Sequence, residues 1–242
     1  MIVGVDHVAI AVEDWDAALR CYAQLLGQPV PAELPWLGRR AVVFALSNAR
    51  VVLHEGSGGL LSLALGVRDG AACVRQLAAA GMRAPALSEG LWQLEPEHSR
   101  GVQLQLVQRA ALELPAANSF ASDRVEALDH VVIRSAAPEQ AAALYGGALG
   151  IRLALDRELA GKRMLFFRTG GVTLEVIADT TDGFYGLAYR VRNLAAVHAR
   201  LTAAGFTLTE LRDGRKKGTQ VFSVRASTCG VPTLFIRDAS RD

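Results

Sequence analysis

Residues 5–12, VDHVAIAV, and residues 128–135, LDHVVIRS, open two similar stretches of this 242-residue chain and decide its fold. The two stretches align without a gap, so that His7 matches His130. Each begins with a run rich in Val and Ile that is too short for a helix, which predicts a strand. An Ala-rich stretch with apolar residues at helical spacing follows, and it ends at Gly27 or Gly150, each suited to a left-handed C-cap.

A second pair of similar segments indicates that the repeat extends through the chain. Residues 67–82, VRDGAACVRQLAAAGM, match residues 191–206, VRNLAAVHARLTAAGF, and both read as helices ending at a glycine. Strand-like runs lie between these helices. The sequence therefore predicts four strand–helix–strands units in two halves, divided by a turn-rich segment at about residues 108–127.

Composition excludes several classes of protein. The chain has 26 Lys and Arg against 24 Asp and Glu, so it lacks the basic face that nucleic-acid binding requires. No apolar run reaches the length of a membrane span, and the first residues read as a strand rather than a signal peptide. Its three cysteines, Cys21, Cys73 and Cys229, are far apart and fit neither a disulfide framework nor a paired metal site. We expect a cytoplasmic protein that binds a small molecule, with no nucleic-acid or membrane partner; an oligomer is left open.

The motifs DHVAIAV…AALRCYAQLLG, DHVVIR…AAALYGGALG and GVTLEVIAD resemble those of the vicinal oxygen chelate superfamily over nearly the whole chain. This superfamily includes glyoxalase I, methylmalonyl-CoA epimerase, extradiol dioxygenases and bleomycin-resistance proteins. The resemblance implies an α+β fold of four βαβββ modules, forming two tandem domains whose curled, mostly antiparallel sheets surround cavities. The expected boundaries are residues 1–110 for the first domain, 111–126 for a linker and 127–242 for the second domain.

In that superfamily a divalent metal is held by residues of the first and last strands of each module. The resemblance places His7, His54, Ser62 and Gln105 at these four positions in the N-terminal half. A two-residue slip of the alignment would put Val52 in place of His54. These residues make a weak metal site, because Ser62 and Gln105 stand where the family usually has His and Glu.

In the C-terminal half the same four positions fall on His130, Glu175, Gly186 and Leu234. Gly186 and Leu234 have no side-chain ligand, and two ligands rarely hold a divalent ion. The His, His, Glu set of an extradiol dioxygenase is therefore incomplete. His130 and Glu175 are the predicted catalytic residues, either as ligands of a divalent metal (Mn, Fe, Ni, Co or Zn) or as a metal-free acid/base pair. No organic cofactor is indicated.

Three arginines are candidates for binding an anionic substrate, because a guanidinium can bind two oxygens at once: Arg134, Arg190 and Arg225. For each arginine taken alone, a strand end that extends its charge to water is the more favoured interpretation. Tyr22 and Tyr145 recur on the helix face that should pack on the sheet, so we expect them in the core.

Two functions from different classes follow from this reading. The first is an enzyme of lyase or isomerase type that acts on a small oxygenated substrate around His130 and Glu175. The second is a metal-free small-molecule-binding protein of the bleomycin-resistance kind, in which Gly186 and Leu234 contribute apolar wall. A purely structural role, with both cavities filled by side chains, is the third possibility.

Overall fold

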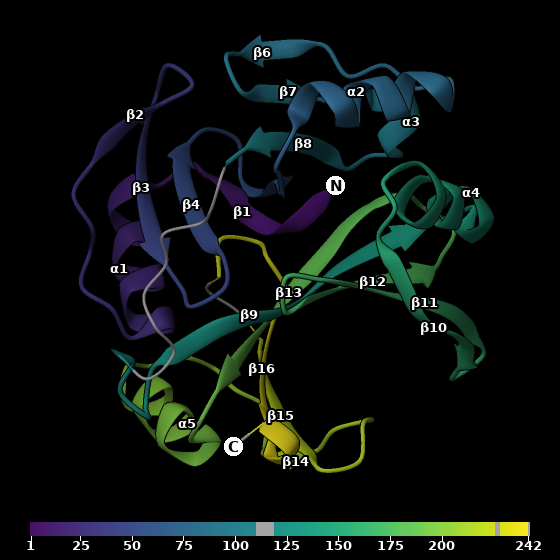
Figure 1. The fold of residues 1–242 in the computed structure, drawn as a ribbon. Coiled ribbons are helices and arrows are strands. Elements are labelled where there is room, and N and C mark those ends of the chain that lie inside the picture. The colour runs from purple at the N-terminus through teal and green to yellow at the C-terminus, as the bar shows by residue number, and fades with distance from the viewer. Residues whose placement is uncertain (110–118, 226–227, 242) are drawn as a thin grey trace. The chain divides into compact units, whose positions relative to one another are not determined.

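The computed structural model describes residues 1–109, 119–225 and 228–241, and its two eight-stranded sheets repeat one strand order (Figure 1). The order β2-β3-β4-β1-β5-β8-β7-β6 of the first sheet recurs as β10-β11-β12-β9-β13-β16-β15-β14 in the second. This identity confirms the internal repeat. The first sheet contains β1 (Ile2–Val12), β2 (Leu34–Trp36), β3 (Arg39–Ala45), β4 (Arg50–Glu55), β5 (Gly59–Val67), β6 (Ala86–Ser88), β7 (Leu91–Gln93) and β8 (Gln103–Gln108). The second contains β9 (Val125–Ser135), β10 (Arg152–Leu159), β11 (Lys162–Thr169), β12 (Val172–Ala178), β13 (Gly183–Val191), β14 (Arg212–Asp213), β15 (Thr219–Val224) and β16 (Thr233–Asp238).

Both sheets mix strand directions. The outer hairpins are antiparallel, from β2 to β4, β6 to β8, β10 to β12 and β14 to β16. Parallel pairs in the centre of the sheets include β5 with β8, β9 with β12 and β13 with β16. A parallel pair needs a crossover connection. The fold is therefore α+β with mostly antiparallel sheets, as the resemblance implied.

The helices begin and end where the sequence pattern predicts. The Asp14 side chain caps the first helix by accepting from the Ala17 N–H, and Gly27 ends it in the left-handed region at φ 70°. Tyr22 and Tyr145 are buried, which confirms them as core residues. The helices are α1 (Trp15–Leu26), α2 (Gly70–Ala79), α3 (Pro96–Ser99), α4 (Pro138–Ala142) and α5 (Leu194–Ala203), with a short 3-10 turn at Ala239–Arg241.

The two halves differ at the helix after the Asp-His strand. In the first half α1 is one regular helix, whereas in the second half α4 continues into a π-helix at Ala143–Ala148. The Leu149 N–H donates to Leu144 O at 2.9 Å, the five-residue bond of a π turn.

The described residues group into two compact units, and each unit takes segments from both halves of the chain. One unit lies within Met1–Val8, Leu61–Glu113 and His130–Tyr185; the other lies within Ala9–Leu60, Leu114–Asp129 and Gly186–Asp242. Strands β1 and β9 contribute to both units. The domain division at residues 110 and 127 stays a prediction.

Half of the predicted linker, residues 111–118, lies outside the described residues. Strand β9 begins at Val125, just before the expected start of the second domain. In the described part of the chain, no helix is both long and apolar enough to cross a membrane.

Candidate functional site

Strands β9 and β12 bring the second Asp-His motif beside the carboxylate of the TLEV run. Their parallel register pairs His130 with Thr173 and Val132 with Glu175. The His130 Nε2 atom lies 3.7 Å from Glu175 Oε2, and the two side chains are 17% and 16% exposed. The predicted pair is thus one polar cluster that solvent or a small molecule can reach.

A tight hairpin between β11 and β12 extends this face by one strand. Gly170 and Gly171, both at positive φ, form its two-residue turn, so that Thr169 pairs with Val172. The same register sets Phe166 opposite Glu175 and Arg168 opposite Thr173. Directly opposed residues share one face of a sheet.

Arg168 and Thr173 were missed by the sequence reasoning. The Arg168 Nη1 donates to Thr173 Oγ1 at 2.7 Å, next to His130 in the row across the sheet. The TGGV turn was the signal that could have found them, because a Gly-Gly hairpin fixes the register of both strands.

Arg134 is the candidate arginine on the same strand as His130. The two residues are four apart on β9 and so lie on one face. Its guanidinium lies 5.7 Å from the centroid of the Tyr185 ring, a cation–π distance. Its buried Nε makes no hydrogen bond to any residue that the structure describes. An unsatisfied buried donor of this kind suits a ligand carboxylate or phosphate.

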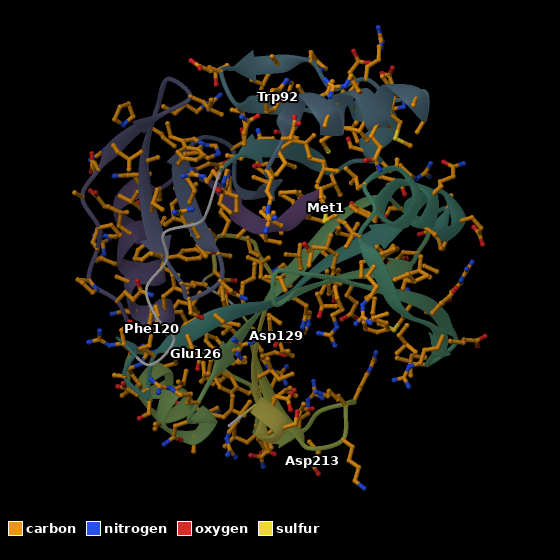
Figure 2. The ribbon with its side chains drawn as sticks, viewed as in Figure 1. Met1, Trp92, Phe120, Glu126, Asp129 and Asp213 are labelled. Atoms are coloured by element: carbon orange, nitrogen blue, oxygen red, sulfur yellow. The ribbon has the colours of Figure 1, made fainter. Side chains whose placement is uncertain are left out.

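The other two candidate arginines are engaged or exposed. Arg190 lies 3.3 Å from Glu126 and 3.8 Å from Asp129, two acids on β9 that Figure 2 labels. Arg225 follows the end of β15 and is exposed. Their roles in substrate binding stay predictions, which no contact described here supports.

The first Asp-His motif lies in a closed polar cluster. The His7 ring is 1% exposed, and its Nδ1 donates to Asp6 Oδ1 at 2.7 Å. The other oxygen of this fully buried carboxylate lies 2.5 Å from Arg109 Nε. This arrangement neutralises a buried charge, a structural task that needs no ligand.

The backbone register places Val52, not His54, at the position of Glu175. The Gly56 N–H donates to Val12 O in the first half, as the Asp179 N–H donates to Ser135 O in the second. Val12 and Ser135 are the matching last residues of the two opening motifs. Val52 and Glu175 each lie four residues before the donating residue, so the alignment of His54 with Glu175 is wrong and the two-residue slip is right.

His54 is instead buried, and its Nδ1 donates to Glu55 O at 3.1 Å. Val52 lies in a buried apolar cluster with Ala9 and Ala41. Trp36 and Val43 pack against this cluster. The position equivalent to Glu175 has no carboxylate in this half, and the role of His54 as a metal ligand stays a prediction.

Strand pairing supports the alignment of the third and fourth ligand positions between the two halves. Gln105 pairs with Ala64, which lies two residues after Ser62. Leu234 pairs with Ala188, which lies two residues after Gly186. Gln105 is buried and donates to Gln93 Oε1 at 3.2 Å. A Cβ on Gly186 would lie 2.4 Å from Pro232 O, so close backbone approach requires the glycine there.

The residues around His130 supply an incomplete metal shell. Metal bonds of about 2.0–2.2 Å to His and carboxylate can span the 3.7 Å between His130 and Glu175. Within the described ranges, however, the only three His, Cys, Asp or Glu residues with ligand atoms within 4.8 Å of one another are Glu95, Glu97 and His98. Arg83 already pairs with both of those glutamates. The described side chains therefore do not fit a metal held by protein ligands alone.

The basic run at residues 213–218 forms the loop of the β14–β15 hairpin. It lines a cavity of about 610 Å³ together with Arg237. Lys216 binds Asp238, at the end of β16, through a direct ion pair. This contact fixes the loop to the sheet.

Comparison with known proteins agrees with this geometry. A family model described as Glyoxalase/Bleomycin resistance protein/Dioxygenase superfamily matches residues 129–222. No curated protein sequence matches the chain.

Solved structures resemble the chain over nearly its whole length. A triple mutant of 4-hydroxymandelate synthase from Streptomyces coelicolor has a TM-score of 0.75 at 16% identity, covering 98% of this chain and 93% of that one. The Mn(II)-bound glyoxalase from Novosphingobium aromaticivorans has a TM-score of 0.75 at 15% identity, covering 98% and 82%. A halotolerant catechol dioxygenase has a TM-score of 0.72 at 11% identity, covering 98% and 87%.

At these identities the structural likeness shows the fold, while the family model adds the sequence pattern of the second half. Residues 129–222 therefore match the glyoxalase/bleomycin resistance protein/dioxygenase superfamily in sequence, and nearly the whole chain has the fold of these solved structures.

Proposed function

We propose that the protein is an enzyme of lyase or isomerase type that moves a proton on a small oxygenated substrate at His130. The observation that carries the proposal is the His130–Glu175 pair, 3.7 Å apart and accessible on one face of β9 and β12. A histidine is suited to this task because its charge changes near neutral pH.

Each side chain has a distinct role in this reaction. The neutral imidazole of His130 takes a proton from the carbon beside a substrate carbonyl. The Glu175 carboxylate stabilises the imidazolium that forms, because opposite charges at this separation attract. Arg134, whose Nε makes no hydrogen bond to a described residue, binds the substrate's anionic oxygen.

The direct test is exchange of carbon-bound protons in D₂O, followed by proton NMR on a panel of 2-oxo acids and α-hydroxy ketones. We expect loss of the signal beside the carbonyl for at least one member. His130→Asn and Glu175→Gln should slow that exchange by about 100-fold, the lower range for general acid–base catalysis. His98→Asn is the matched control, because His98 lies on α3 and has no role in the reaction. Exchange that survives in both site variants would contradict the proposal.

Metal analysis separates the two versions of this chemistry. The incomplete ligand set predicts that protein purified without chelator carries divalent metal well below one ion per chain. One bound ion per chain, lost in both His130→Asn and Glu175→Gln, would replace the acid–base role by a metal-ligand role.

Metal-free ligand binding is the second candidate function. Phe166, directly opposite Glu175 on the same face of the sheet, favours it. A thermal-shift screen with aromatic ligands tests it, because a ligand that binds only the folded state raises the melting temperature. Binding that Glu175→Gln leaves unchanged, in a protein without proton exchange, would favour this function over catalysis.

A further inference from the structure

Helix α1 and the turn before β16 bring two of the three cysteines together. Cys21 lies on α1, and Cys229 lies in the turn Thr228–Val231. Both are half-buried, and their sequence neighbours Tyr22 and Thr228 are in direct contact. The two cysteines are far apart in the sequence, and only the fold brings α1 and this turn together.

The turn is held in place from both sides. The Val231 N–H donates to Thr228 O at 3.1 Å, and the Tyr22 hydroxyl of α1 donates to the same oxygen at 3.4 Å. The Thr228 hydroxyl donates back to Val231 O. Cys229 itself is held at φ 52°, a region that a residue with a side chain rarely adopts. These bonds hold the backbone around Cys229 against α1.

The two thiols are chemically unequal. A hydrogen bond from Cys21 lowers the pKa of Cys229, because it stabilises the thiolate. The same bond, together with burial, raises the pKa of Cys21. Cys229 is therefore the nucleophile of the pair, and Cys21 is the thiol placed to resolve its oxidised form.

We propose that Cys21 and Cys229 are a reversible oxidation site that forms an intramolecular disulfide with peroxide as oxidant. The Cys229 thiolate attacks one peroxide oxygen, the O–O bond breaks, and the leaving oxygen is protonated to water. The Cys229 sulfenic acid is then attacked by Cys21, which forms the S–S bond and releases a second water. Two thiols are oxidised and one peroxide is reduced to two waters. The bond requires the sulfurs to approach to about 2.05 Å.

The disulfide would connect α1 near one end of the chain to the segment entering β16 near the other end. A crosslink that closes so long a loop restricts the unfolded chain strongly. Oxidation is therefore expected to raise the melting temperature, and reduction with dithiothreitol is expected to reverse the rise.

The test is thiol counting and peptide mapping of the full-length protein before and after stoichiometric hydrogen peroxide. The expected result is a fall from three free thiols to one, with a Cys21–Cys229 crosslinked peptide and free Cys73. Cys73→Ser is the matched control and keeps the crosslink, because Cys73 lies on α2 and is buried. Cys21→Ser should leave Cys229 as a sulfenic acid that dimedone labels.

The wild-type map alone decides the proposal if a variant fails to fold. Three thiols that persist after peroxide would overturn it, as would a disulfide to Cys73. Oxidation of Cys229 to sulfinic acid without a crosslink would also overturn it, because Cys21 would then not act as the resolving thiol.

Discussion

His7 and His130 occupy matching positions on β1 and β9, yet their surroundings differ. His7 is buried and bound to Asp6, whereas His130 is accessible and lies beside Glu175. The matching position of Glu175 in the first half is Val52. Both halves thus keep the Asp-His motif, but only the second half has a carboxylate at the second position, which is why we place the proposed reaction there.

Removing the buried aspartate of the first motif should have the largest effect on stability. Asp6→Ala leaves Arg109 and His7 without their shared carboxylate. Loss of one partner of a buried ion pair costs about 3–5 kcal/mol in the free energy of unfolding. Asp129→Ala, at the partly exposed equivalent, should cost about 1 kcal/mol. Urea unfolding measures both, and equal losses would break the distinction between the two motifs.

The variant Gly186→Ala tests why residue 186, at the third ligand position of the second half, has no side chain. Gly186→Ala forces a Cβ against Pro232 O and should destabilise the fold by about 2–3 kcal/mol. Gly147→Ala is the matched control, because its Cβ would meet no atom within 4 Å. That control should be neutral or stabilise by about 0.5 kcal/mol. A Gly186→Ala protein as stable as the parent would show that the close approach of Pro232 does not require a glycine at this position.

The loop between β14 and β15 in the second half is expected to make a smaller, pH-dependent contribution to stability. Burial alone would raise the pKa of Asp238, but hydrogen bonds from Lys216 and Ser240 outweigh it and lower that pKa to about 2. A lowered folded-state pKa adds stability above the unfolded value of about 3.9, and this stability is lost as the pH falls from about 4 toward 2.

Lys216→Met should therefore raise the pKa of Asp238 and move the acid-induced loss of stability to higher pH. Because Lys216 is more than half exposed, we expect a cost of only about 1 kcal/mol at pH 7. Unfolding free energies measured between pH 2 and 7 check this. Identical pH profiles for parent and variant would contradict the anchoring role of Lys216.

The fold could be predicted from the sequence because the repeat, the strand runs and the glycines at helix ends all agree. The choice between His54 and Val52 could not, because side chains two apart on a strand share one face and a two-residue slip preserves the pattern. Backbone hydrogen bonds at Gly56 and Asp179 settle it. The Cys21–Cys229 pair was likewise beyond the sequence, since only the tertiary fold brings them together.

The central claim is that the His130 face, and not the His7 cluster, receives the ligand. Its most direct test is NMR of protein with ¹³C-labelled histidine rings during titration with glycolate, a small anion with neighbouring oxygens. We expect the His130 ring signal to shift to saturation, the His7 signal to stay fixed, and Arg134→Ala to weaken the response. A shift at His7 with none at His130 would contradict ligand binding at the His130 face.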